Sequence, residues 1–133
     1  MRPIVLKNKL YSDNRGYFRE YFKNKIYSKK INVNFCQDNI SYSKKNVIRG
    51  LHFRIKPQVQ IISLLKGSIF DVVVNIDKSS KNFGQVYEYY LDSEKDNQLI
   101  LPGNYAHGFC VLSSEAIMNY KTNKYYNKKF EGG

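Results

Sequence analysis

Apolar and polar residues alternate along most of this chain, and this period of two constrains its fold more than any other feature. Such alternation is typical of strands with one face in a core, and Gly, Pro, Asn, Asp or Lys residues separate the runs. Many short strands at this spacing predict an all-β sandwich or barrel. The expected strands are residues 16–22, 34–43, 47–54, 60–67, 68–76, 85–91, 98–102 and 106–112. Only residues 24–30 and 93–98 are expected to form a helical turn or two.

The length of 133 residues predicts a single domain over residues 1–133, because two cores would each bury too little surface. No run approaches the ~18 apolar residues of a membrane span, and the first ten residues are too polar for a secretory signal. We therefore expect a cytoplasmic protein without a membrane partner. Cys36 and Cys110 lie in apolar runs without CxxC spacing, which predicts buried free thiols rather than a disulfide.

The net charge of +11 has two possible explanations, one functional and one compositional. A field of this sign attracts nucleic acid, anionic lipid or a phosphorylated small molecule. Lysine pairs beside many Asn, Ile and Tyr residues are also what an AT-rich genome places at exposed positions. The pairs are Lys29 and Lys30, Lys44 and Lys45, and Lys128 and Lys129.

Charged residues interrupt the run at residues 47–54, where His52 lies between Arg49 and Arg54. In a strand of a small barrel, an ionisable residue on the inward face must be paired or functional. Strict alternation places Arg54 with His52 and Arg49 on the opposite face, unless Gly50 introduces a bulge. A lone histidine in an apolar strand is either a core residue or a functional one. A metal site is disfavoured, because Arg54 would place a cation beside the ligand.

The run at residues 34–43 presents Gln37, Asn39 and Ser41 on one face. If that face lines the interior, its hydrogen-bonding groups suit a sugar or a base. If it faces solvent, it is only the polar half of an amphipathic strand.

Five motifs follow one another from about Asp13 to Glu131 and read SDNRGYFREYF, QDNISYSKKNVIRGLHF, GSIFDVVVNIDKSSKNFG, LILPGNYAHGFCVLSSEA and NYKTNKYYNKKFEGG. In this order they resemble the dTDP-4-dehydrorhamnose 3,5-epimerase family of nucleotide-deoxysugar epimerases. The resemblance implies a cupin-like jelly roll. It also implies an epimerase that inverts C3, C5 or both in a nucleotide-linked 4-keto-6-deoxyhexose, for deoxysugar or surface-polysaccharide synthesis.

The resemblance assigns roles to individual residues. His52 matches the general base that removes the proton beside the 4-keto group, and Tyr120 matches the general acid on the other face of the ring. The implied substrate-binding positions are Arg15, Glu20, Gln37, Asp38, Asn39, Arg49, Gln60, His107, Tyr125 (which stacks on the base) and Glu131. The implied partners are a nucleotide-diphosphate sugar and a second copy of the chain, with strands exchanged between subunits. Neither metal nor redox cofactor nor nucleic acid is expected.

Two departures from the family pattern concern these residues. Gln60 occupies the place of a lysine that points at the enolate oxygen, and losing one such donor lowers a rate by ~10² to 10³. Lys56 is a candidate substitute. Family members also continue past the position of Glu131 into a segment whose aspartate orients the catalytic histidine, so residues 1–133 are expected to lack it. Asp38 or Glu20 could act in its place.

Two alternatives stay open beside the epimerase. One is a nucleotide-sugar 3,4-ketoisomerase on the same fold, although such enzymes carry a second histidine where this chain has Arg54. The other is a degenerate barrel that binds nucleotide sugars, or single-stranded nucleic acid through its basic, tyrosine-rich surface.

Overall fold

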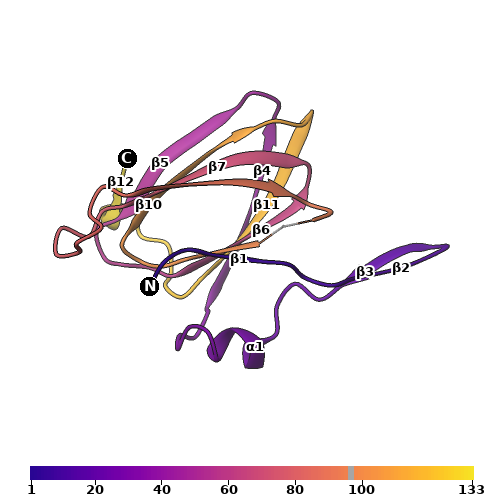
Figure 1. Cartoon of the computed structure of the whole chain (residues 1–133), viewed down its shortest axis with the longest axis horizontal. Helices are drawn as coiled ribbons and strands as arrows, with labels where there is room; N and C mark the ends of the chain where they lie inside the picture. The colour runs from indigo at the N-terminus through magenta and orange to yellow at the C-terminus, as the bar shows by residue number, and fades with distance from the viewer. Residues whose placement is uncertain (96–97) are drawn as a thin grey trace.

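The computed structural model describes residues 1–95 and 98–133 (Figure 1). Strands dominate it, with one short α-helix and one 3₁₀ helix among the described residues. In chain order the elements are β1 (Ile4–Leu6), β2 (Leu10–Asp13), β3 (Gly16–Arg19), α1 (Asn24–Ser28), β4 (Gln37–Lys44), β5 (Ile48–Arg54), β6 (Gln60–Lys66), β7 (Ser68–Asn75), β8 (Val86–Asp92), β9 (Gln98–Leu101), β10 (Tyr105–Val111), β11 (Glu115–Thr122), η1 (Lys128–Phe130) and β12 (Glu131–Gly132).

The strands form two five-stranded antiparallel sheets, which lie against each other as two layers (Figure 1). One sheet has the order β1-β9-β6-β11-β4, and the other has the order β12-β5-β10-β7-β8. Strands β2 and β3 form a separate hairpin that extends away from both layers (Figure 1). The expected all-β sandwich is therefore confirmed.

The main core lies between the two sheets and follows from the alternation. In β7, alternate side chains from Ile69 to Asn75 are buried, and in β11 Ala116 and Met118 point inward. Large aliphatic side chains from β6, β8 and β9 complete this core, including Ile62, Leu91 and Leu99.

A second apolar layer covers the outer face of the first sheet. Tyr27 and Ile31, from α1 and the segment after it, pack on Ile61 and Ile100. Strands β6 and β9 therefore have both faces buried, which explains their nearly continuous apolar sequence. Gln98 sits in this layer, where its Nε2 donates to Ser63 Oγ at 2.7 Å and its Oε1 accepts from the Tyr27 hydroxyl.

The expected strands all form, although several are shorter than their apolar runs. β3 ends at Arg19 and β4 begins only at Gln37. The sequence pattern missed β1, β2, β11 and β12. The helical turn expected at residues 24–30 is confirmed by α1. Of the helical turn expected at residues 93–98, residues 93–95 form a turn and a bend instead, Gln98 begins β9, and residues 96–97 lie outside the described residues.

The prediction of two buried thiols is wrong. Cys36 is exposed and Cys110 is half-buried, and both are free. Cys36 lies just before β4 begins, so the alternation of that strand does not apply to it. Among the described residues no helix is long and apolar enough to cross a membrane. The cytoplasmic location stays a prediction.

Candidate active site

A cavity of about 320 Å³ opens between the two sheets. One wall comes from β5, β10 and β12, and the facing wall comes from β4, β6 and β11. The polar side chains that line it are Asn39, Arg49, His52, Arg54, Gln58, Gln60, Tyr105, His107, Tyr120, Thr122 and Glu131.

A β-bulge in β5 brings three cationic or titratable side chains to this cavity. His107 pairs with His52, whereas Phe109 pairs with Arg49, so two steps along β10 correspond to three along β5. The extra residue places Arg49, His52 and Arg54 on one face, and all three line the cavity. This corrects the strict alternation, which puts Arg49 on the opposite face.

Gly50 makes the bulge possible. Its φ is +99°, in the region that favours glycine. A Cβ at this position would lie 2.5 Å from the backbone oxygen of His107 and 2.7 Å from Cα of Gly108, closer than any side chain could fit.

His107 sits beside His52 and is held by a buried carboxylate. Its Nε2 lies 2.7 Å from Oδ2 of Asp71, a residue with no solvent exposure. This contact fixes the orientation of the His107 ring. Oδ1 of Asp71 has no hydrogen-bond partner among the described residues. A charged residue inside the apolar run of β7 was the signal that could have identified Asp71 from the sequence.

Tyr120 lines the cavity from the sheet opposite that of His52. Its hydroxyl lies 3.2 Å from Oγ of Ser41. Burial raises the pKa of the Tyr120 phenol, and this effect outweighs the opposing hydrogen bond with Ser41 and the positive charge of Arg49.

Arg49 is fixed by β4. Its Nε donates to Ser43 Oγ at 2.9 Å, and its Nη2 donates to the backbone oxygen of Tyr42 at 3.1 Å. Among the described residues no carboxylate lies within ion-pair distance of its guanidinium. Arg49 is therefore a positioned cation whose charge no described side chain neutralises.

The sequence left open whether the polar face of β4 lines the interior or faces solvent. In the structure this face points into the molecule. Asn39 lines the cavity, Ser41 reaches Tyr120, and Gln37 Nε2 donates to Asn39 Oδ1 at 2.8 Å. Asp38 faces the other way, where it pairs with Lys121 at 2.6 Å. The structure therefore does not bring Asp38 to the cavity.

Gln60 lines the cavity next to a second amide. Its Nε2 donates to Oε1 of Gln58 at 3.1 Å, and Gln58 Nε2 donates to the backbone oxygen of Lys124 at 2.7 Å. Lys56 does not take the place of the family lysine, because its ammonium lies over the ring of Phe130 at 4.2 Å and outside the cavity lining.

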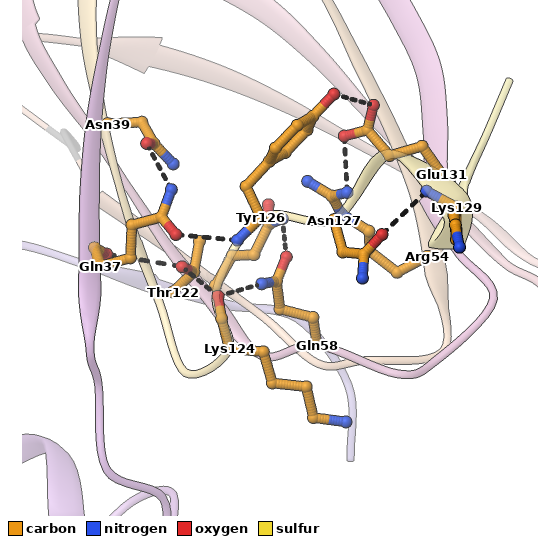
Figure 2. Close-up of polar contacts among 11 residues, drawn as sticks. Gln37, Asn39, Arg54, Gln58, Thr122, Lys124, Tyr126, Asn127, Lys129 and Glu131 are labelled. Carbon is orange, nitrogen blue, oxygen red and sulfur yellow. Dashed lines mark hydrogen bonds and ion pairs between the residues drawn. The ribbon is translucent and has the colours of Figure 1, made fainter.

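A smaller hollow of about 200 Å³ adjoins the cavity, and Arg54 and Gln58 line both. Tyr125, mostly exposed, lines the smaller hollow. Figure 2 shows the polar contacts of this region: Glu131 pairs with Arg54 at 2.6 Å and accepts a hydrogen bond from the Tyr126 hydroxyl at 3.2 Å.

Arg15 and Glu20 lie outside the cavity. Arg15 is at the tip of the β2–β3 hairpin and pairs with Asp13 at 2.6 Å, and Glu20 follows β3 and pairs with Lys23. Of the residues predicted from the sequence, the cavity thus brings together His52, Tyr120, Asn39, Arg49, Gln60, His107 and Glu131. Gln58, Thr122 and Arg54 also line it, and the sequence did not single them out as site residues.

A jelly roll whose interior sets a histidine opposite a tyrosine, beside fixed cations, defines a cupin-like sugar isomerase, and comparison with known proteins agrees. The profile described as dTDP-4-dehydrorhamnose 3,5-epimerase matches residues 3–133. The chain belongs to the dTDP-4-dehydrorhamnose 3,5-epimerase family.

Individual relatives cover nearly the whole chain. The sequence is 42% identical over 134 residues to the dTDP-4-dehydrorhamnose 3,5-epimerase of Shigella flexneri, covering 98% of this chain and 74% of that protein. The structure matches the 3,5-epimerase of Legionella pneumophila in complex with dTDP-4-keto-L-rhamnose, with a TM-score of 0.93 and 40% identity over 97% of this chain and 70% of that one. It also matches the Bacillus anthracis enzyme with TDP and PPi bound, with a TM-score of 0.93 and 37% identity over 98% and 77%.

Proposed function

We propose that this protein inverts C3, C5 or both in a dTDP-linked 4-keto-6-deoxyhexose, a step toward dTDP-rhamnose and surface polysaccharide. One observation carries the proposal. In a chain of the epimerase family, His52 and Tyr120 line facing walls of one cavity, as abstraction and return of a proton on opposite faces of a sugar ring require.

His52 is the proposed base. A hydrogen on a carbon beside a ketone is weakly acidic, and its removal breaks the C–H bond and leaves an enolate. The imidazole of histidine is the side chain that most often serves as such a base. His107, oriented by Asp71, lies beside His52 and offers its Nδ1 to the substrate.

Tyr120 is the proposed acid. Its raised pKa keeps the proton on the phenol until His52 has removed a proton from the other face of the ring and left a strongly basic enolate carbon. The carbon receives the proton of the Tyr120 hydroxyl, which inverts the centre and leaves a protonated His52 and a Tyr120 phenolate. Proton exchange with solvent then restores both groups for the next turnover.

The developing oxyanion needs a donor in the same cavity. Arg49 supplies an uncompensated positive charge and Gln60 supplies a neutral amide, and both line the cavity. Preorganised donors of this kind are among the largest contributions to catalysis.

A homodimer is the proposed assembly. The β2–β3 hairpin projects from the sheets (Figure 1) and exposes Tyr17 and Phe18, the latter at 65%. Exposed aromatic residues on a projecting hairpin favour burial against another chain. Insertion against a second copy would place Arg15 and Glu20 near that copy's substrate, which is consistent with their absence from their own cavity.

Exchange of substrate hydrogen with solvent tests the function. The protein is incubated with dTDP-4-keto-6-deoxyglucose in deuterated water, and deuterium at C3 and C5 is followed by NMR. Label at one or both carbons is expected, because abstraction at each centre is followed by return of a solvent-derived proton. Wild-type protein that binds the sugar nucleotide but incorporates no label above background would refute the epimerase.

Two variants separate the roles of the two residues. His52→Ala is expected to abolish exchange at both carbons. Tyr120→Phe is expected to keep exchange at the abstracted position while it loses inversion, because the base is intact and the acid is missing.

A further inference from the structure

Arg54 lies where the main cavity meets the smaller hollow, and it lines both. It follows His52 by two residues on the same face of β5, about 6.6 Å along the strand. A hexose ring with its anomeric oxygen spans a similar length. An anion held at Arg54 therefore places the attached sugar over His52.

The guanidinium of Arg54 is available for exchange. Its partner is Glu131, with Nη1 and Oε1 2.6 Å apart, and the two side chains are 20% and 40% exposed. Partly exposed ion pairs are weak, whereas a guanidinium binds phosphate through two parallel, charge-assisted hydrogen bonds. Glu131 has a second partner, because it also accepts a hydrogen bond from the Tyr126 hydroxyl (Figure 2).

Charge balance points to the same exchange. A nucleoside diphosphate ester carries about two negative charges on its phosphates, and Arg49, one of the two arginines that line the cavity, is assigned to the developing oxyanion. Arg54 is the second arginine, and only release of Glu131 makes its charge available to the ligand.

We propose that Arg54 is a further anion-binding residue, which exchanges Glu131 for a phosphate of the nucleoside diphosphate and so sets the preference for a diphosphate. This inference rests on the proposed function, because it presumes a dTDP-linked ligand. Arg54 acts on binding, and Glu131 is its competitor in the empty site.

Calorimetric binding of dTDP and of inorganic pyrophosphate tests the proposal. The variants are Arg54→Gln, Glu131→Gln and the control Lys128→Gln, which removes an exposed positive charge on η1. Arg54→Gln is expected to weaken pyrophosphate binding by about tenfold or more, since one charge-assisted pair is lost. Glu131→Gln breaks the same ion pair but frees Arg54, so pyrophosphate should bind as tightly or more tightly. Lys128→Gln should stay within about twofold of wild type.

The two ion-pair variants together decide the outcome. Equal weakening in Arg54→Gln and Glu131→Gln would mean that the pair only supports the wall between β5 and β12, and would overturn the proposal. Unchanged pyrophosphate affinity in Arg54→Gln, with dTDP still bound by wild type, would overturn this inference alone. Failure of wild type to bind dTDP at all would instead count against the proposed function. Melting temperatures of the variants show that each is folded.

Discussion

At the scale of single residues, the Tyr120 phenol connects catalysis with stability. Burial raises its pKa, so the folded protein holds this proton more tightly than the unfolded chain does. The stabilisation is fully present below the unfolded pKa of about 10, and it is lost as the pH rises from there through the higher pKa of the folded state.

Tyr120→Phe tests this dependence on pH. The free energy of unfolding of wild type minus that of the variant should be constant up to about pH 9 and should fall above about pH 10, by at most ~1.4 kcal/mol per unit of pKa difference. Urea unfolding of both proteins at several pH values measures it. A difference that rises with pH would contradict burial as the dominant influence on this phenol.

Replacing Gln60 by lysine would add a positive charge to the cavity where the neutral amide now lies. In Gln60→Lys, Oε1 of Gln58 is in place to hold the new ammonium, and a cation stabilises an enolate oxygen better than an amide does. The turnover of dTDP-4-keto-6-deoxyglucose should rise, by about 10² if Gln60 is the main oxyanion donor. Gln60→Glu should be slower than wild type. If Gln60→Lys is no faster at saturating substrate, Arg49 is the principal donor.

The sequence identified most residues of the candidate site, but it did not identify the residues that hydrogen-bond with them. His52, His107 and Tyr120 were identified from motifs, and the structure places them in one cavity. The contacts of Ser41 with Tyr120 and of Asp71 with His107 join residues that are 79 and 36 positions apart. No local pattern encodes such pairs, because they depend on which strands become neighbours.

At the scale of elements, the bulge in β5 decides which side chains reach the cavity. Alternation alone gives Arg49 the wrong face, and only the two-against-three pairing with β10 corrects it. The strands that the sequence missed have related explanations. β1 and β12 are two or three residues long, and β11 alternates within a run that also carries polar residues on its outer face. Strand length and pairing are set by the neighbouring strands, which a local pattern does not contain.

Gly50→Ala tests the bulge. The added Cβ would meet the backbone of His107 and Gly108, and the φ of +99° disfavours alanine, so the variant should lose several kcal/mol of stability and most of its activity. Gly84→Ala is the matched control, because its φ is also positive at +78° but nothing lies within 4 Å of the new Cβ. It should lose only ~1 kcal/mol and keep full activity. Chemical denaturation and turnover are measured for both. Equal losses would mean that the backbone conformation alone, rather than the close approach of β10, makes Gly50 necessary.

At the scale of the whole molecule, the proposed dimer links the hairpin to a distant cavity. Phe18→Asp places a charge on the exposed hairpin surface, where a monomer tolerates it and a buried interface does not. Light scattering should give the mass of a dimer for wild type and of a monomer for the variant. Activity should fall with dissociation, because Arg15 then reaches no cavity. Tyr90→Asp, on the exposed face of β8, is the control and should remain a dimer. A wild-type protein that is a monomer at the concentrations of the activity assay would contradict the assembly.

Because β6 and β9 are buried on both faces, their apolar side chains alone do not specify the register in which the two strands pair. In a strand with one polar face, a register shift of one residue is unfavourable because it moves the apolar side chains into solvent. Strands β6 and β9 are apolar on both faces, so this penalty does not apply to them. The pair of Ser63 with Gln98, opposite each other in the ladder, is the exception. A shifted alignment would separate the buried Ser63 hydroxyl from the Gln98 amide, so this polar contact distinguishes the native pairing from its near neighbours.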